Sequence, residues 1–95
     1  MKRCKVLIVD DEGVQRELIC EVLQTSEGRF DTAFDVLQAS NGAEALETMR
    51  HHTVNAVLLD KRMPIMDGDE LCMNIRSTLG MPLLPILMVT GKIGY

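Results

Sequence analysis

Three short apolar runs recur along the chain, and each one stops at a polar side chain. They are residues 6–9 before Asp10, residues 56–59 before Asp60, and residues 86–89 before Thr90. Continuous apolar runs of this length are typical of strands that are buried on both faces of a parallel sheet. A fourth, weaker run at residues 36–39 ends at Ser40-Asn41-Gly42, which is a turn signal. The pattern therefore predicts four strands.

The segments between these runs carry apolar residues at the three- and four-residue spacing of a helix face. The expected helices begin after Asp11 or Glu12, after the turn at residues 40–42, and near Asp67. Their apolar positions are Val14, Leu18, Ile19, Val22 and Leu23 in the first, Ala43, Leu46 and Met49 in the second, and Leu71, Ile75 and Leu79 before Gly80 in the third. Residues 25–34 form a polar connection to which the pattern assigns no structure. The alternation of strands and helices predicts an α/β fold with a parallel sheet and helices on both faces.

The length and composition fit one ordinary globular domain, and we expect residues 1–95 to form a single unit. The chain has 46% apolar and 25% charged residues, which excludes a disordered tail or a coiled coil. Ten Lys and Arg against fourteen Asp and Glu give a net charge of −4, which argues against a surface that holds nucleic acid or anionic lipid. No apolar run approaches the roughly 20 residues of a membrane span. Three cysteines without paired spacing fit the reducing cytoplasm.

The polar residues that end the strands are the candidate functional residues. In an open parallel sheet, ligands bind at the carboxyl ends of the strands, where Asp10, Asp11, Asp60 and Thr90 fall. If the first and third strands are neighbours, their ends lie about 5 Å apart. Three carboxylates so close repel one another unless a cation offsets their charge, and a hard divalent ion such as Mg²⁺ prefers oxygen ligands. The sequence therefore predicts a magnesium site.

Such a site suits the transfer of a phosphoryl group. A carboxylate beside Mg²⁺ can attack phosphorus and form an acyl phosphate. Asp60 is the better candidate nucleophile, because Asp10 and Asp11 are better placed as a pair that holds the metal. The Thr90 hydroxyl can donate a hydrogen bond to a phosphoryl oxygen, and so can the backbone N–H groups that follow Asp60.

Four motifs, taken together, identify a family. They are residues 9–12 (VDDE), residues 39–46 (ASNGAEAL), residues 58–68 (LLDKRMPIMDG) and residues 85–90 (PILMVT). Together they resemble four segments of the response-regulator receiver domains of two-component signalling. In order, these segments are the acidic pair, the junction between the second strand and the second helix, the phosphoacceptor segment, and the fourth strand with its switch threonine. The resemblance implies a flavodoxin-like, doubly wound parallel sheet with the strand order 2-1-3-4.

The resemblance also implies a role for each candidate residue. Asp60 would accept a phosphoryl group from a histidine kinase or a phosphotransfer protein. Asp11 would bind Mg²⁺ directly and Asp10 mostly through water, and the backbone carbonyl of Arg62 would be a further ligand beside Asp60. Thr90 would turn inward to the phosphoryl group and change the conformation of the loop that follows it, which makes the domain a two-state switch.

The end of the chain departs from the family pattern. Receiver domains continue after the switch threonine with a helix, a strand and another helix, whereas this chain stops at Tyr95. The catalytic lysine that ends the family's fifth strand has no counterpart, because Lys92 stands too close to Thr90. We therefore expect a C-terminally truncated receiver domain over residues 1–95. Its fourth strand would be an exposed apolar edge, which favours self-association.

Two alternative functions stay open. The first is a pseudo-receiver that cannot be phosphorylated and acts only by binding other proteins, because the family's lysine is missing. The second is a haloacid-dehalogenase-like phosphohydrolase, which also uses an aspartate at a strand end with Mg²⁺. That enzyme would need a second aspartate two residues after Asp60, where Arg62 stands.

Two further motifs are predicted to be structural. Asp67-Gly68-Asp69 resembles a metal-binding DxD motif, but it is better explained as a turn that begins the third helix. His51 and His52 would point about 100° apart on a helix, which makes them poor chelators. We expect a solvated pair at the end of the second helix.

Overall fold

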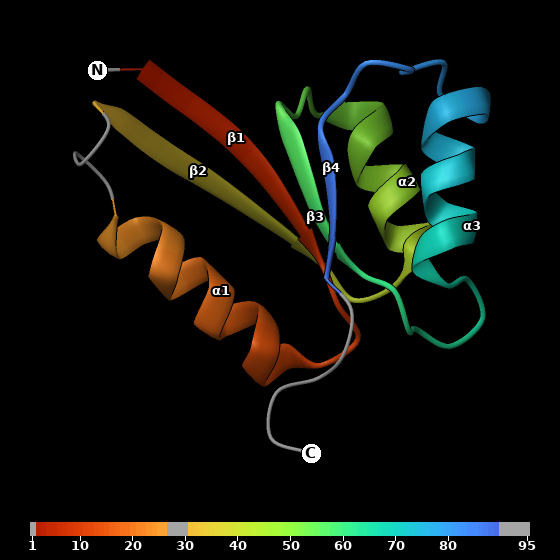
Figure 1. The fold of residues 1–95 in the computed structure, drawn as a ribbon, viewed down its shortest axis with the longest axis horizontal. Helices are drawn as coiled ribbons and strands as arrows, with labels where there is room; N and C mark the ends of the chain where they lie inside the picture. The colour runs from red at the N-terminus through yellow and green to blue at the C-terminus, as the bar shows by residue number, and fades with distance from the viewer. Residues whose placement is uncertain (1, 27–30, 90–95) are drawn as a thin grey trace.

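Four parallel strands form a single sheet in the order β2-β1-β3-β4. The computed structural model describes residues 2–26 and 31–89 of the chain. The strands are β1 (Lys2–Val9), β2 (Thr32–Ala39), β3 (Ala56–Asp60) and β4 (Ile86–Val89), and the helices are α1 (Gly13–Thr25), α2 (Gly42–His51) and α3 (Gly68–Met73). Helix α1 lies on one face of the sheet, and α2 and α3 lie on the other (Figure 1). The predicted α/β fold and its strand order are confirmed.

The main core lies between the sheet and the helices α2 and α3. Successive side chains of a strand point to opposite faces, so Leu7 and Val9 of β1 face this core, whereas Val6 and Ile8 face the side of α1. All four side chains are buried. The core is completed by residues from β3 and from the two helices, among them Val57, Leu59, Leu46, Met49, Leu71 and Ile75. Burial on both faces explains why β1 is a continuous apolar run in the sequence.

The second and third helices begin where the sequence indicated. Asn41 caps α2 and Asp67 caps α3, and each side chain accepts a hydrogen bond from the backbone N–H three residues further on, at 2.8 and 2.9 Å. The third helix continues as a π-helical segment, η1 (Asn74–Thr78), and the chain then turns at Gly80, whose φ is +66°. Within the described residues, no helix is long and apolar enough to cross a membrane.

Strands β1 and β2 are longer than the apolar runs predicted. They pair from Lys2 and Thr32 onward, so that their polar first halves also belong to the sheet. Part of this pairing is an ion pair across the two strands, in which Nε of Arg3 donates to Oδ2 of Asp35 at 3.1 Å. A cross-strand pair of this kind cannot be found from runs of apolar residues. Helix α1 also extends to Thr25, into the connection that the pattern left unassigned.

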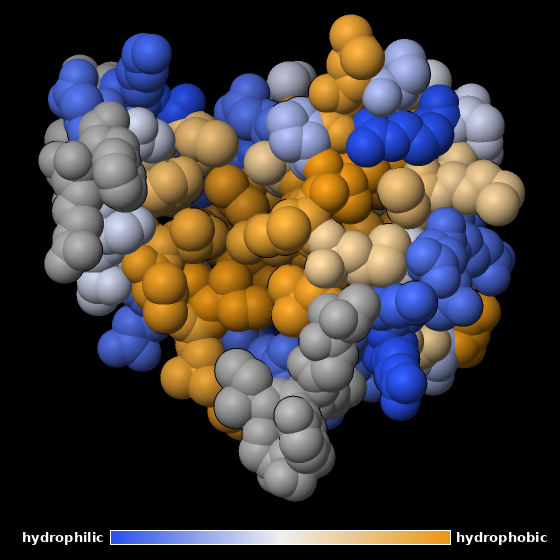
Figure 2. Space-filling view, in the orientation of Figure 1, coloured by the Kyte–Doolittle hydropathy of each residue, from blue (hydrophilic) through white to orange (hydrophobic). Residues whose placement is uncertain are grey.

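Helix α1 differs most from its sequence pattern. The apolar spacing predicts the helix correctly, yet Val14, Leu18 and Val22 are between 57% and 76% exposed, and none of the residues of α1 is buried. Figure 2 shows apolar side chains gathered over this side of the molecule. Glu12, one of the two predicted residues, takes the N-cap position, but its side chain makes no capping hydrogen bond.

Candidate metal centre

Three carboxylates meet at one edge of the sheet. Asp10 and Asp11 directly follow β1, and Asp60 is the last residue of β3. The register of these neighbouring strands pairs Val9 with Leu59, so the chain reaches Asp10 and Asp60 at the same level of the sheet. One carboxylate oxygen from each of the three aspartates lies within 4.8 Å of the other two. The structure thus brings together the three side chains that the sequence placed at strand ends.

Backbone N–H groups hold the two buried carboxylates. Asp10 is 2% exposed and Asp60 is 4% exposed, whereas Asp11 is exposed. The amide of Glu12 donates to Oδ1 of Asp10 at 2.9 Å, and the amide of Arg62 donates to Oδ1 of Asp60 at 3.1 Å. In both cases the donor lies two residues beyond the aspartate, as in an Asx turn. These bonds offset part of the free energy that burying a carboxylate costs.

The donor set suits a hard divalent cation. Mg²⁺ binds carboxylate and carbonyl oxygens, whereas structural zinc sites use the nitrogen of His and the sulfur of Cys. In the part of the chain that the structure describes, the candidate metal-binding group consists of carboxylates alone. A bound cation would offset the repulsion among three negative charges at short range. The residues present therefore fit Mg²⁺, with the exposed Asp11 on the side open to water.

Close backbone contacts fix the loop that follows Asp60. A Cβ at Gly68 would lie 2.7 Å from the carbonyl oxygen of Asp60, and the Gly68 amide donates to the carbonyl of Lys61 at 2.9 Å. A Cβ at Gly42 would lie 2.5 Å from Sδ of Met66, so the loop also packs against the start of α2. The sequence marks both glycines only as turn residues, because the contacts come from segments that are distant in the chain.

Of the remaining predicted site residues, the structure describes Arg62 but not Thr90. Thr90 and Lys92 lie outside the described residues, so what the sequence implies about them stays a prediction. The strand that leads to Thr90 does end beside the site, because Val89 pairs with Asp60 in the register of β4 and β3. The side chain of Arg62 is exposed, and the proposed role of its backbone carbonyl stays a prediction.

The Asp67-Gly68-Asp69 motif and the His51-His52 pair lie at helix ends, as we predicted. Asp67 caps α3 and Gly68 is the first residue of that helix, so the interpretation as a turn is confirmed. Nε2 of His51 lies 2.8 Å from Oε1 of Glu47, one helical turn earlier. His52 follows as the C-terminal cap of α2, and both imidazoles are exposed, as expected of a solvated pair.

Sequence reasoning missed Arg16. This residue lies on α1 and contacts the loop that carries Asp10 and Asp11, which we call the acidic loop. One guanidinium nitrogen donates to the backbone carbonyl of Asp10 at 2.6 Å, and Nε donates to Oε1 of Gln38 on β2 at 3.1 Å. No motif in the sequence pointed to either residue, because their contact depends on how α1 lies across the sheet.

Comparison with known sequences gives one consistent match. A family model described as the response regulator receiver domain matches residues 6–94. The chain is 39% identical over 88 residues to the alkaline phosphatase synthesis transcriptional regulatory protein PhoP of Bacillus subtilis, and 35% identical over 89 residues to the autoinducer 1 sensor kinase/phosphatase LuxN of Vibrio campbellii. These matches cover 93% and 94% of this chain but only 33% of PhoP and 10% of LuxN.

Comparison with solved structures agrees. The chemotaxis response regulator CheY4 of Vibrio cholerae superposes with a TM-score of 0.83 at 29% identity, covering 98% of this chain and 72% of that one. The signal receiver domain of the putative response regulator NarL from Mycobacterium tuberculosis superposes with a TM-score of 0.78 at 30% identity, covering 99% of this chain and 71% of that one. The similarity extends over the whole sheet and its helices.

Proposed function

The chain belongs to the response regulator receiver domain family, and on that premise we propose that Asp60 accepts a phosphoryl group from a phosphohistidine in a reaction that depends on Mg²⁺. Receiver domains are components of two-component systems and are signalling modules rather than classical enzymes. The observation that carries the proposal is the group of three carboxylate oxygens within 4.8 Å of one another at the ends of β1 and β3.

The proposed chemistry is a transfer between two proteins. An oxygen of Asp60 attacks the phosphorus, the phosphorus–nitrogen bond of the donor breaks, and its electron pair leaves on the imidazole nitrogen. Asp10, Asp11 and Asp60, with the backbone carbonyl of Arg62, would hold the metal ion. When bound, Mg²⁺ supplies positive charge to the phosphoryl oxygens in the transition state. Asp60 itself is 4% exposed, so little of the acceptor carboxylate is open to water.

Thr90 is the proposed sensor of the phosphoryl group. Its support is the register that puts Val89, the preceding residue, beside Asp60. A hydroxyl group that donates to a phosphoryl oxygen would favour one of two conformations of the following loop. In this way the new charge on Asp60 would change the surface that partner proteins bind.

The proposed phosphodonor is a histidine kinase or a phosphotransfer protein. The similar segment occurs in LuxN, a sensor kinase/phosphatase by its name, and in PhoP, a transcriptional regulatory protein by its name. The domain thus serves in proteins of both kinds. The net charge of −4 gives no support for binding to nucleic acid or to a membrane by this part of the chain. We propose that it works in the cytoplasm.

Self-association through β4 is a separate part of the proposal. Within the described residues β4 is an edge strand, and Leu87 on it is exposed. An edge offers unpaired backbone groups to another strand, and Pro85 removes only one N–H just ahead of the strand. Size-exclusion chromatography with light scattering should show dimers that increase with concentration. A monomer at every concentration would contradict this part of the proposal.

Phosphorylation with a small donor tests the main proposal. The wild type, incubated with acetyl phosphate and Mg²⁺, should gain the mass of one phosphoryl group in intact-protein mass spectrometry. Asp60→Asn should gain nothing. Asp69→Asn is the matched control, because Asp69 is also an aspartate near this loop but is exposed and lies outside the acidic group. It should be labelled like the wild type.

Each other outcome has a definite meaning. An unlabelled wild type would favour the pseudo-receiver, which binds partners without phosphorylation. Turnover of phosphate esters would favour the phosphohydrolase. A label that persists in Asp60→Asn would show that another side chain is the acceptor, and the proposal would then be wrong.

A further inference from the structure

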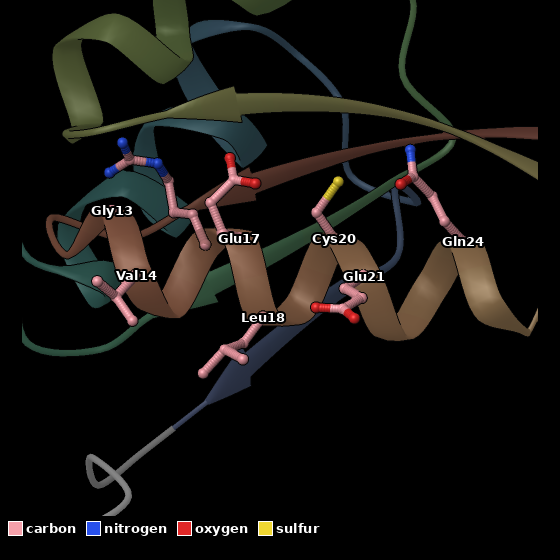
Figure 3. A pocket seen from close by; sticks show the side chains of 8 residues that line it. Gly13, Val14, Glu17, Leu18, Cys20, Glu21 and Gln24 are labelled. Carbon is pink, nitrogen blue, oxygen red and sulfur yellow. The ribbon is translucent and has the colours of Figure 1, made fainter.

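Polar contacts as well as half-buried apolar side chains, such as Ile19 and Leu23, connect α1 to the sheet. None of the residues of α1 is buried. Nε of Arg16 donates to Oε1 of Gln38 on β2 at 3.1 Å, and Nε2 of Gln38 donates to Oε1 of Glu17 at 3.0 Å. Figure 3 shows Glu17 on the side of α1 that faces β2, whereas Val14 and Leu18 point away from that strand. Gln38 thus bonds to two side chains of α1 and links this helix to β2.

The same guanidinium group reaches the acidic loop. It donates to the backbone carbonyl of Asp10 at 2.6 Å. The Asp10 amide donates to the carbonyl of Ala39 at 3.1 Å, and Oδ1 of Asp10 accepts from the amide of Glu12. The carbonyl of Asp10 and the amide of Asp11 belong to one planar peptide group, so a bond that fixes this carbonyl also orients Asp11.

We propose that Arg16 is a positioning residue of the metal centre, which clamps the loop of Asp10 and Asp11 to Gln38 and thereby sets the affinity for Mg²⁺. The inference rests on the proposed function, because it requires Mg²⁺ at the acidic group. The planar fork of a guanidinium makes two hydrogen bonds in two fixed directions, which an ammonium group does not reproduce. Groups that orient metal ligands typically change metal affinity about 10- to 100-fold.

The direction in which removal of Arg16 changes the affinity for Mg²⁺ distinguishes a positioning role from a purely electrostatic one. A positive charge near a cation site repels the cation, so charge alone predicts that removal of Arg16 strengthens the binding of Mg²⁺. Orientation predicts the opposite, because Asp10 and Asp11 lose the contact that holds their shared peptide group. The two explanations therefore differ in direction and not only in size.

Calorimetric titration with Mg²⁺ alone, in the absence of any phosphodonor, tests the proposal. Arg16→Ala should raise the dissociation constant about 10-fold. Arg16→Lys keeps the charge but not the fork, so its dissociation constant should also rise. Gln38→Leu keeps every charge and removes the far end of the clamp, and it should weaken binding as well. Arg50→Ala is the matched control, because Arg50 is an exposed arginine on α2 that pairs with Glu47, and it should bind like the wild type.

The same titrations contain the results that would overturn the proposal. Equal or tighter binding by Arg16→Ala would overturn it, and so would an Arg16→Lys variant that binds like the wild type. Melting temperatures show whether each variant is folded during the titration, and if Arg16→Ala is unfolded, the decision rests on Gln38→Leu. A wild type that binds no Mg²⁺ would overturn the proposed function together with this inference. Equal dissociation constants for the wild type and Arg16→Ala overturn the inference alone.

Discussion

Gly68 lies so close to Asp60 that a Cβ at this position would come within 2.7 Å of the Asp60 carbonyl oxygen. The Cβ at Gly68 would also lie 2.6 Å from Cδ1 of Leu59 and 2.8 Å from Cα of Lys61. Most of these neighbours are backbone atoms, which cannot rotate away as a flexible side chain can. The start of α3 therefore packs directly on the end of β3, and the loop between them is held at both ends.

We predict that Gly68→Ala destabilises the protein by about 1–3 kcal/mol, because the added methyl group overlaps backbone atoms of β3. Urea denaturation gives the free energy of unfolding. Gly13→Ala is the control, since a Cβ there meets only a guanidinium nitrogen of Arg16 at 3.5 Å, an ordinary contact. Its effect should stay within about 1 kcal/mol. Equal effects of the two substitutions would contradict the close packing at Gly68.

Ile65→Gly should stabilise the protein. Ile65 is fully exposed, and its φ of +73° is unfavourable for a β-branched residue. The amide of Met66 donates to the carbonyl of Pro64 at 2.8 Å across it, which is a tight three-residue turn. Glycine removes the steric cost of about 1–2 kcal/mol, and no buried contact is lost. The free energy of unfolding should rise by about 1 kcal/mol.

Ile65→Ala separates backbone strain from the loss of an exposed apolar side chain. Alanine also removes the apolar surface but keeps Cβ, so its gain in free energy of unfolding should be smaller than that of glycine. Equal gains for the two variants would show that strain at this position is not the cause.

Mg²⁺ should stabilise the wild type but not Asp11→Asn. A ligand that binds only the folded state adds about 2.7 kcal/mol to the free energy of unfolding at 100 times its dissociation constant. Asp11 is exposed, so its replacement should leave the metal-free protein folded while it removes one of three carboxylates. Thermal unfolding with and without Mg²⁺ measures both effects. Asp69→Asn should respond to Mg²⁺ like the wild type, and a full response by Asp11→Asn would exclude Asp11 as a ligand.

Glu47 should contribute stability that is lost in acid. The hydrogen bond from His51, and then the one from Arg50, hold the pKa of this carboxyl group below its ordinary value of 4.5. A carboxyl group with a lowered pKa in the folded state stabilises the protein above its unfolded pKa, and the contribution disappears as the pH falls through the folded pKa. Glu47→Gln should therefore lower the melting temperature near neutral pH.

The difference in melting temperature between Glu47→Gln and the wild type should shrink as the pH falls below about 4.5. Glu21→Gln is the control, because Glu21 makes no ion pair among the described residues. Its difference from the wild type should not follow this pattern. A Glu47→Gln difference that stays constant with pH would exclude a role for the charge of Glu47.

The sequence predicts those parts of the site that depend on strand ends. Asp10 and Asp60 follow apolar runs that are typical of buried strands, and neighbouring parallel strands bring such residues to one edge. Arg16 and Gln38 could not be predicted, because a hydrogen bond between a helix and an edge strand depends on the position of the helix across the sheet. The exposure of Val14 on α1 was unpredictable for a similar reason, since periodicity defines an apolar face but not what covers it.

The lack of buried residues in α1 has a consequence for hydrogen exchange. We expect the amides of α1 to exchange through local opening, whereas those of β3 and of the buried half of β1 should exchange only when most of the molecule unfolds. The proposed metal centre would thus join Asp60, on a strand that we expect to exchange slowly, to Asp11, which lies two residues before α1. A cation held by Asp11 and Asp60 should then slow hydrogen exchange in α1, because part of its binding free energy would hold the start of that helix in place.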